Sequence, residues 1–353
     1  MMKHVLYISN IEVPYRVAFF NQLAEKCDLT VLYERNKSSN RDALWTSSVK
    51  LHFHKEYLNG KDVGNENSFS FDIIKVINRG WDAIIIGCYN SYVQMMAVLY
   101  MRYNRIPFII SLDGEPFIGN GIKGLLKKFF LKGASAYLTA GRESANNLKK
   151  VLGEKSKVYP YYFSSLTDEE IKTMGTETVE RDRYVLVVGQ YFEYKGMDVA
   201  FKVADLNHKI RYKFVGMGSR TEMFITEMGQ IPENIEVVPF LQKYELEKEY
   251  QHCSMLLLPS RQECWGLVVN EAAAFGTPIV STWGSGAAQE FLGEKYSGYL
   301  AEPGDAKSLL ACVEKCYYAD NTEYSKYLQE KSRYYSIEKS VEEHMQAINS
   351  LIY

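Results

Sequence analysis

The stretch LLLPSRQECWGLVVNEAAAFGTPIVS, residues 256–281, decides the fold of this chain. It opens with an apolar run that stops at Pro259, as a buried parallel strand does where it meets a loop. A helix-forming segment at 266–275 follows the polar loop and is closed by Gly276, with a proline two residues later. A second apolar run at 278–281 completes a strand–helix–strand unit. This pattern is typical of a parallel sheet covered by helices.

Two glutamates flank the start of the expected helix. Glu263 lies in the loop, and Glu271 follows after seven intervening residues, at least one turn inside the helix. The backbone N–H groups of Gly266, Leu267 and Val268 are expected between them, at the positive end of the helix dipole. Ligands of parallel sheets bind beyond the carboxyl ends of the strands. A phosphate on these amides, with a carboxylate on either side for hydroxyl groups, suits a sugar nucleotide.

The frame around these glutamates resembles the donor signature of the retaining glycosyltransferases of family 4, which have the GT-B fold, and in particular those of the bacterial surface-polysaccharide type. The frame runs through a strand, Pro-Ser, Glu263, Gly-Leu-Val, Glu271, Gly-Thr-Pro and a second strand. Two glutamates at this spacing alone also suit a surface helix with solvated side chains. The resemblance implies that Glu263 contacts hydroxyls of the donor sugar near the reacting carbon. It implies that Glu271 accepts a hydrogen bond from the nucleotide ribose.

The segment VLVVGQYFEYKGMD, residues 185–198, carries a second part of the resemblance. Its buried strand ends at Gly189, and Lys195 opens a helix, where a flexible point charge can reach a diphosphate. A lysine at that end of a helix is unfavourable without an anionic partner. Family members usually have Arg directly after the first glycine, but Gln190 stands there in this chain. Donor binding is therefore expected to depend more on Lys195 and the helix amides.

Three further stretches resemble the donor site more loosely. Val238 and Phe240 match the region that frames the base, although Phe240 also suits plain core packing. The sequence GSGAAQE at 284–290 resembles the glycine-rich turn after the next strand. Gly216 and Gly218 suit either a nucleotide-side loop or an ordinary turn.

The chain divides into two parts in which strands and helices alternate. Its 353 residues exceed what one compact core needs, and the polar segment 160–180 interrupts the alternation. We expect an acceptor-binding Rossmann-like domain at 1–165 and a nucleotide-sugar-binding one at 166–335. The resemblance implies an α/β GT-B fold, in which two doubly wound domains face across a cleft and helix 336–353 crosses back to the first domain. Between residues 36 and 67 the pattern is irregular, with short alternating pieces around 51–54.

The first domain offers three candidate residues. Asp113 ends a buried strand in the sequence Asp-Gly-Glu, where a carboxylate suits an acceptor hydroxyl or the donor sugar. Many family members have His at about this place. Tyr15 and Arg16, at the start of the first helix, are candidates for contacts with acceptor or phosphate. The expected catalytic set is therefore Glu263, Lys195 and Asp113.

Charge is distributed unevenly along the chain. The net charge is −2, but residues 1–165 carry 22 Lys+Arg against 14 Asp+Glu, or +8, and residues 166–353 carry 19 against 29, or −10. The basic half suits an anionic partner such as a membrane surface. Solvated surfaces without a binding role also often carry an uneven distribution of charge. Within the basic half, the sequence GIKGLLKKFFLK at 121–132 predicts a basic amphipathic helix. Such a helix suits an anionic membrane surface, or its apolar residues pack on the sheet.

Several classes of protein are excluded or disfavoured by the sequence. No apolar run reaches the roughly 20 residues of a membrane span, and the first residues resemble a strand rather than a signal peptide. Six scattered cysteines without zinc-like spacing suggest reduced thiols in a cytosolic protein. No P-loop, Ser/His/Asp set, metal-ligand cluster or nucleic-acid motif is present. We expect a cytoplasmic protein, peripheral on the inner face of the cell membrane, with no metal and no cofactor.

The resemblance implies a retaining, metal-independent hexosyltransferase of polysaccharide biosynthesis. It would use a nucleotide-diphosphate sugar, a UDP-sugar ahead of a GDP-sugar, and a glycan or lipid-linked glycan as acceptor. A glycogen-type phosphorylase or synthase is disfavoured because no pyridoxal lysine context is visible. Two alternatives on the same fold stay open. One is a sugar-nucleotide-binding protein with lost catalysis, which Gln190 supports, and the other is a nucleotide-sugar epimerase, which needs no acceptor.

Overall fold

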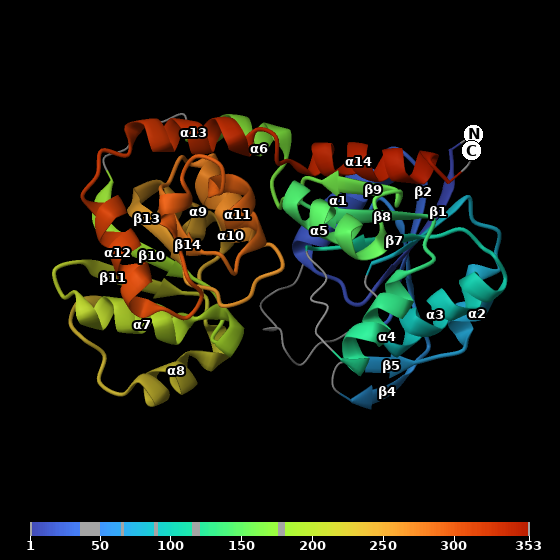
Figure 1. Cartoon of the computed structure of the whole chain (residues 1–353), viewed down its shortest axis with the longest axis horizontal. Coiled ribbons are helices and arrows are strands. Elements are labelled where there is room, and N and C mark those ends of the chain that lie inside the picture. The colour runs from blue at the N-terminus through green and yellow to red at the C-terminus, as the bar shows by residue number, and fades with distance from the viewer. Residues whose placement is uncertain are drawn as a thin grey trace. The chain divides into compact units, whose positions relative to one another are not determined.

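The chain forms two compact units, each built around its own parallel sheet (Figure 1). The computed structural model describes residues 2–35, 50–64, 67–87, 91–114, 121–175 and 181–351. One unit comprises Met1–Ser165 with Ile337–Tyr353, and the other comprises Leu166–Ser336. Strands that alternate with helices and pair in parallel confirm the predicted α/β class with two Rossmann-like halves.

The first unit contains, within the described residues, a seven-stranded parallel sheet in the order β3-β2-β1-β6-β7-β8-β9. Its strands are β1 (His4–Ser9), β2 (Asp28–Tyr33), β3 (His54–Tyr57), β6 (Ala83–Ile86), β7 (Ile109–Leu112), β8 (Ala136–Ala140) and β9 (Val158–Tyr161). A separate antiparallel pair consists of β4 (Lys61–Gly64) and β5 (Asn67–Phe69). The helices are α1 (Pro14–Ala24), α2 (Asp72–Ile77), α3 (Tyr92–Tyr103), α4 (Ile122–Leu131), α5 (Arg142–Leu152) and α14 (Ile337–Asn349).

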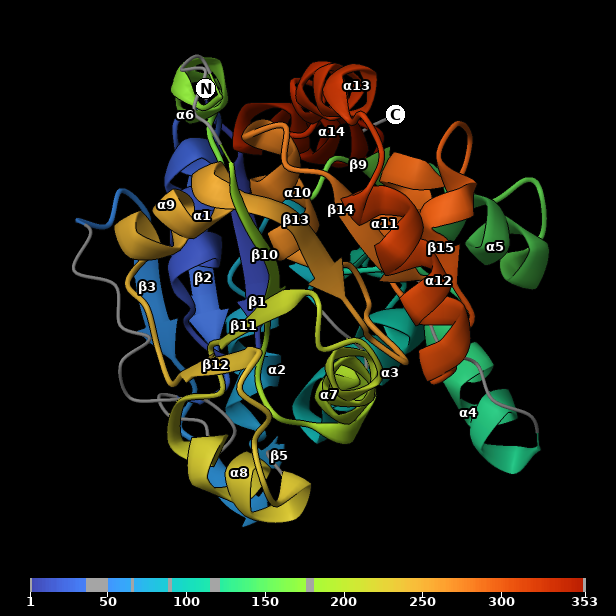
Figure 2. The same cartoon turned by 90° about the vertical axis from the view of Figure 1, so that its left-hand side faces the viewer.

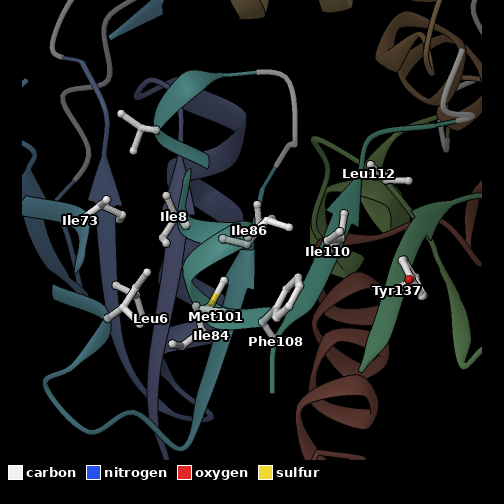
Figure 3. Packing of buried hydrophobic residues seen from close by; sticks show 14 of the residues in the cluster. Leu6, Ile8, Ile73, Ile84, Ile86, Met101, Phe108, Ile110, Leu112 and Tyr137 are labelled. Atoms are coloured by element: carbon white, nitrogen blue, oxygen red, sulfur yellow. The ribbon is translucent and has the colours of Figure 1, made fainter. Parts of the chain in front are cut away.

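A large part of the first unit's core lies between the sheet and helices α2 and α3 (Figure 3). Leu6 and Ile8 of β1 and Ile84 and Ile86 of β6 are buried there with Met101 of α3. Strands covered on both faces read as continuous apolar runs, which is why β1 and β6 are recognisable in the sequence. The edge strand β3 has the polar sequence HKEY and largely exposed side chains, which is why the sequence shows only short alternating pieces near it and no clear strand.

The C-terminal helix α14 packs on α1 and β9, and so belongs to the first unit (Figure 1). Ile337, Val341, His344 and Ile348 are buried along it at spacings of three to four residues. That spacing gives one buried stripe on an otherwise polar helix.

The described part of the predicted junction, residues 160–175, contains regular elements that its sequence does not suggest. It contains the end of β9 and helix α6 (Asp168–Thr173), which begins with a capping box between Thr167 and Glu170. An element of four to six residues is too short to show a periodic pattern, so the sequence indicates only an irregular junction.

The second unit contains a six-stranded parallel sheet in the order β12-β11-β10-β13-β14-β15, counted over the described residues. Its strands are β10 (Asp182–Val188), β11 (Arg211–Val215), β12 (Ile235–Val238), β13 (Cys253–Leu258), β14 (Ile279–Thr282) and β15 (Leu300–Ala301). Its longer helices are α7 (Met197–Leu206), α8 (Thr221–Met228), α9 (Lys243–His252), α10 (Leu267–Ala274), α11 (Gly286–Leu292), α12 (Ala306–Tyr317) and α13 (Thr322–Ser332). Short 3₁₀ turns lie at η1 (Glu193–Lys195), η2 (Gly218–Arg220) and η3 (Ser297–Tyr299).

The order of strands in the second sheet reverses between β10 and β13, which lie side by side (Figure 2). The chain builds outward from β10 through β11 to β12, and then returns to place β13 on the other side of β10. The connections on the two sides therefore diverge at the carboxyl ends of β10 and β13. Ligands of open α/β sheets bind at such a switch point.

Candidate functional site

Lys195 and Glu263 meet at the switch point of the second sheet. Lys195 ends the 3₁₀ turn η1 after β10, and Glu263 lies in the loop after β13. The Lys195 ammonium forms an ion pair with Glu263 Oε2, and the two side chains are 22% and 15% exposed. Ser260 Oγ lies 3.4 Å from the same carboxylate oxygen. The fold thus brings together two of the three predicted catalytic residues, which are 68 positions apart in the chain.

Backbone hydrogen bonds hold the loop that carries Glu263. Tyr194 O accepts from the N–H groups of Arg261 and Gln262, at 2.8 and 3.1 Å. Glu263 N donates to Gly284 O at 2.8 Å. The loop is therefore fastened on one side to the loop after β10 and on the other to the glycine-rich turn after β14. In this structure that turn supports the Glu263 loop through its main chain.

Two glycines allow these segments to approach so closely. Gly196 has φ +69° and ψ 23°, in the left-handed region, and a Cβ on it would lie 2.1 Å from Pro259 O. A Cβ on Gly284 would lie 2.4 Å from Arg261 O. Any other residue at either place would push backbone against backbone, so the spacing of the loops requires glycine.

An ion pair that the sequence does not reveal fixes the same loop from its outer side. Arg261 Nη1 and Nη2 donate to the two carboxylate oxygens of Asp198 on α7, at 2.7 and 2.6 Å. Arg261 Nη1 also donates to Glu193 O at 2.7 Å. Burial raises the pKa of Asp198, but its hydrogen bonds and charge contact with Arg261 outweigh this and lower the pKa overall. Such a two-pronged pair constrains orientation as well as distance.

Helix α10 begins directly behind Glu263 and carries Glu271 one turn inside. Gly266 precedes its first residue, Leu267, and the first N–H to donate along the helix is that of Val269, to Gly266 O at 2.9 Å. The N–H groups of Gly266, Leu267 and Val268 therefore have no acceptor within the helix. Glu271 accepts a hydrogen bond of 2.9 Å from the hydroxyl of Tyr250 on α9. Burial, together with the nearby carboxylate, raises the pKa of Tyr250 well above its usual value. The sequence indicates the helix that carries Tyr250 but not the direction of this side chain.

The loosely predicted stretches of the second unit also converge. Gly216 N donates to Val238 O at 3.3 Å, and Gly218 N donates to Pro239 O at 2.7 Å, so the turns after β11 and β12 are joined. Phe240, which follows, is partly buried. Gln190 also lies partly buried, directly after β10.

The predicted residues of the first unit form a polar cluster at the ends of β1, β7 and β9. Arg16, only 7% exposed, forms an ion pair with Asp113 and donates to Tyr7 Oη at 3.3 Å. Tyr161 Oη donates to Asp113 Oδ1 at 3.1 Å. Burial alone would lower the pKa of Arg16, but the charge of Asp113 raises it well above its usual value. Arg16 thus holds Asp113 in place inside this unit, and acceptor contacts of Arg16 and Asp113 stay predictions.

Aromatic side chains pack next to this cluster. His344 of α14 lies against the rings of Phe19 and Tyr161, with centroids 4.6 and 4.8 Å away, and burial lowers its pKa to about 3. Tyr15 meets the ring of Phe163 edge-on at 5.8 Å. Glu115, the last residue of the Asp-Gly-Glu sequence, lies outside the described residues.

No group of three or more His, Cys, Asp or Glu side chains in the described part of the chain could hold a metal ion. Every helix found in that part is too short or too polar to cross a lipid bilayer. The cysteines described, Cys27, Cys253, Cys264, Cys312 and Cys316, are free thiols, and Cys88 lies outside the described residues.

Residues 168–334 match the family Glycosyl transferases group 1. An uncharacterized glycosyltransferase of Haemophilus influenzae is 30% identical over 173 residues, which cover 46% of this chain and 48% of that protein. The chain thus spans about half the length of this curated relative.

Solved structures resemble the whole chain. HepE of Anabaena in complex with UDP and glucose superposes with a TM-score of 0.71 at 14% identity, covering 99% of this chain and 100% of that one. WaaG, a glycosyltransferase involved in lipopolysaccharide biosynthesis, gives 0.68 at 11% identity and covers 98% and 99%. At these identities the likeness shows the fold, which is GT-B. Residues 168–334 therefore resemble the Glycosyl transferases group 1 family, within a chain that has the GT-B fold.

Proposed function

We propose that this protein is a retaining, metal-independent glycosyltransferase that uses a nucleotide-diphosphate sugar. The observation that carries the proposal is the meeting of Lys195 and Glu263 at the carboxyl ends of β10 and β13, beside the N-terminus of α10. An ammonium group and helix N–H groups suit a diphosphate, and carboxylates suit sugar hydroxyls. The family match over 168–334 supports the same class of reaction.

The proposed donor site uses the second unit. The diphosphate would bind the first-turn amides of Gly266, Leu267 and Val268 together with Lys195. Lys195 would then exchange part of its contact with Glu263 for the phosphate, which frees that carboxylate for the sugar hydroxyls. Glu271, held by Tyr250, would accept from the ribose. A UDP-sugar is the preferred donor in this proposal, because the GT-B structure of HepE was solved with UDP and glucose.

The proposed reaction needs no strong general base. The oxygen of the acceptor hydroxyl forms a bond to the anomeric carbon as the bond from that carbon to the diphosphate breaks. The bonding electrons leave with the nucleoside diphosphate, and a departing phosphate oxygen takes the proton of the acceptor. Attack from the side of the leaving group retains the anomeric configuration. Lys195 and the amides of α10 stabilise the charge that grows on the diphosphate.

The proposed acceptor is a glycan or lipid-linked glycan in polysaccharide biosynthesis, taken by the first unit. Asp113 would bind an acceptor hydroxyl, because Arg16 and Tyr161 fix its carboxylate while its side chain stays 37% exposed. Tyr15, on the same helix as Arg16, would also contact the acceptor. WaaG, which shares the fold, is involved in lipopolysaccharide biosynthesis. A reaction of this kind belongs at the inner face of the cell membrane, where we place the protein.

A panel of nucleotide sugars tests the proposal. The protein is incubated with UDP-, GDP- and ADP-sugars and a mixture of glycan acceptors, with and without EDTA, and binding is followed by thermal shift. We expect the UDP-sugar to raise the unfolding temperature and to yield a glycoside with retained configuration, in EDTA as well. Activity that EDTA abolishes and manganese restores would contradict the mechanism. Binding without turnover would favour a sugar-nucleotide-binding protein, and conversion of the donor without acceptor would favour an epimerase.

A further inference from the structure

Helix α4 presents its apolar face to the outside. Four apolar side chains recur on one face of it and are largely exposed: Ile122 77%, Leu125 68%, Leu126 53% and Phe129 46%. The opposite face, with Gly124 and Leu131, is the buried one. A surface helix of a globular protein normally buries its apolar stripe. The alternative prediction, that the apolar residues of this helix pack on the sheet, is therefore wrong for these four, whereas Phe130 is partly buried against the core.

The neighbouring helix α3 also exposes apolar side chains. Tyr92, Leu99 and Tyr103 lie along one stripe of α3, with 53%, 44% and 88% of their surface exposed. Helices α3 and α4 are neighbours (Figure 1). Arg102 of α3 joins them, because its Nη1 donates to Phe129 O at 2.8 Å and its guanidinium lies 4.5 Å from the centre of the Phe129 ring. The two helices together form what we call the α3–α4 surface.

The charges along the α3–α4 surface have one sign. Residues 92–112 and 121–135 contain no Asp or Glu, and their basic residues are Arg102, Arg105, Lys123, Lys127, Lys128 and Lys132. At 100° per residue, Lys128 borders the apolar face of α4 on one side, and Lys127 lies on the other side beyond Phe130, towards the buried face. An apolar helix face bordered by lysines is the pattern of a helix that lies in a membrane interface.

We propose that the α3–α4 surface binds an anionic membrane, with the apolar face of α4 among the acyl chains and the lysines at the phosphate headgroups. Anionic lipid is the partner that matches both features, since a soluble anion would leave the apolar side chains in water. A second copy of this chain would bring two basic surfaces of like charge together. The proposed donor and acceptor residues are not part of this surface, so its binding does not depend on the proposed reaction.

Cosedimentation with vesicles tests the apolar part of the surface. We expect the protein to bind vesicles of phosphatidylcholine mixed with phosphatidylglycerol at low salt, and phosphatidylcholine vesicles much less. The double variant Leu125→Ser with Leu126→Ser should lose at least about tenfold in partition coefficient, since two side chains leave the acyl region. The matched control replaces Leu206 and Ile225 by Ser, because these are 56% and 40% exposed in the second unit. The control should bind like the wild type.

A second pair of variants tests the charges. Each lysine near an anionic surface changes the partition coefficient by roughly fivefold at low salt, so Lys127→Gln with Lys128→Gln should weaken binding by up to roughly 25-fold. Salt should reduce the difference in binding between the wild type and this variant, because it screens exposed charges. The control pair, Lys209→Gln with Lys307→Gln, removes two exposed lysines from the second unit and should change little.

Three results would overturn the proposal. The first is that the wild type does not bind the mixed vesicles at low salt. The second is that the Leu125→Ser/Leu126→Ser variant binds them as well as the wild type does. The third is that the wild type forms a dimer in sedimentation velocity and this variant does not. The last would assign the surface to a second copy of the chain. Thermal unfolding of each variant with and without UDP, recorded beside the vesicle assay, separates these results from misfolding and from failure of the proposed donor site.

Discussion

Replacing Gly196 by alanine tests whether the site depends on the close contact between the loops after β10 and β13. The left-handed conformation at φ +69° costs a residue with a side chain about 1–2 kcal/mol. The new Cβ would lie 2.1 Å from Pro259 O, so the two main chains must move apart. Overpacking of this kind costs about 1–3 kcal/mol. The two costs together predict a loss of about 2–5 kcal/mol in the free energy of unfolding.

Gly276→Ala is the matched control. Gly276 also has a left-handed φ, +64°, but the three atoms nearest to its Cβ would all belong to the flexible side chain of Gln329, at 3.0 to 3.1 Å. It should therefore show only the backbone cost of about 1–2 kcal/mol. Urea unfolding followed by circular dichroism measures both losses, and calorimetric titration with UDP reports on the site. We expect Gly196→Ala alone to weaken UDP binding, because Lys195 precedes it. Equal free energies of unfolding in the two variants would refute the steric argument.

Three further predictions concern single side chains. Glu263→Gln should lower turnover far more than UDP affinity, whereas Glu271→Ala should weaken UDP binding by about 1.5–3 kcal/mol. Turnover is measured by kinetics and UDP affinity by calorimetry. Equal changes of turnover and affinity in the two variants would contradict these assignments. Lys195→Ala should lose most of its turnover, whereas Gln190→Ala should lose little. Gln190→Arg should keep or raise the affinity for the donor. A Gln190→Ala variant as inactive as Lys195→Ala would show that the Gln190 amide has another role. Burial holds the pKa of His344 at about 3 in the folded state, below its usual value of about 6.5, so the unfolded chain takes up the proton first as the pH falls and stability is lost from about pH 6.5 towards 3. Between pH 7 and 5.5 the wild type should lose about 1.2 kcal/mol more than His344→Phe in urea unfolding, and parallel losses would contradict the assignment.

The fold class could be predicted because parallel strands buried on both faces are long apolar runs. The strands β1, β6, β10 and β13 stand out in this way, and each is followed by a helical period. The strand β3 and the helix α6 could not be predicted, because they are short and β3 lies at an edge with polar side chains. The local signal of such elements is weak, and their pairing comes from the rest of the sheet.

The sequence by itself determined which residues stand at the ends of strands and starts of helices in the second unit. Lys195, Glu263 and Glu271 were recognisable because glycine, proline and apolar runs mark those positions along the chain. These signals are local, since each depends on the conformational preferences of neighbouring residues.

Only the tertiary structure decided which of these residues touch. It pairs Lys195 with Glu263 and Arg261 with Asp198, and it places Arg16 against Asp113 inside the first unit. It also turned the apolar face of α4 outward, although the helical period of α4 is equally compatible with a buried face. Periodicity shows that a helix has an apolar face, but the side that faces the sheet depends on all the elements that pack against it.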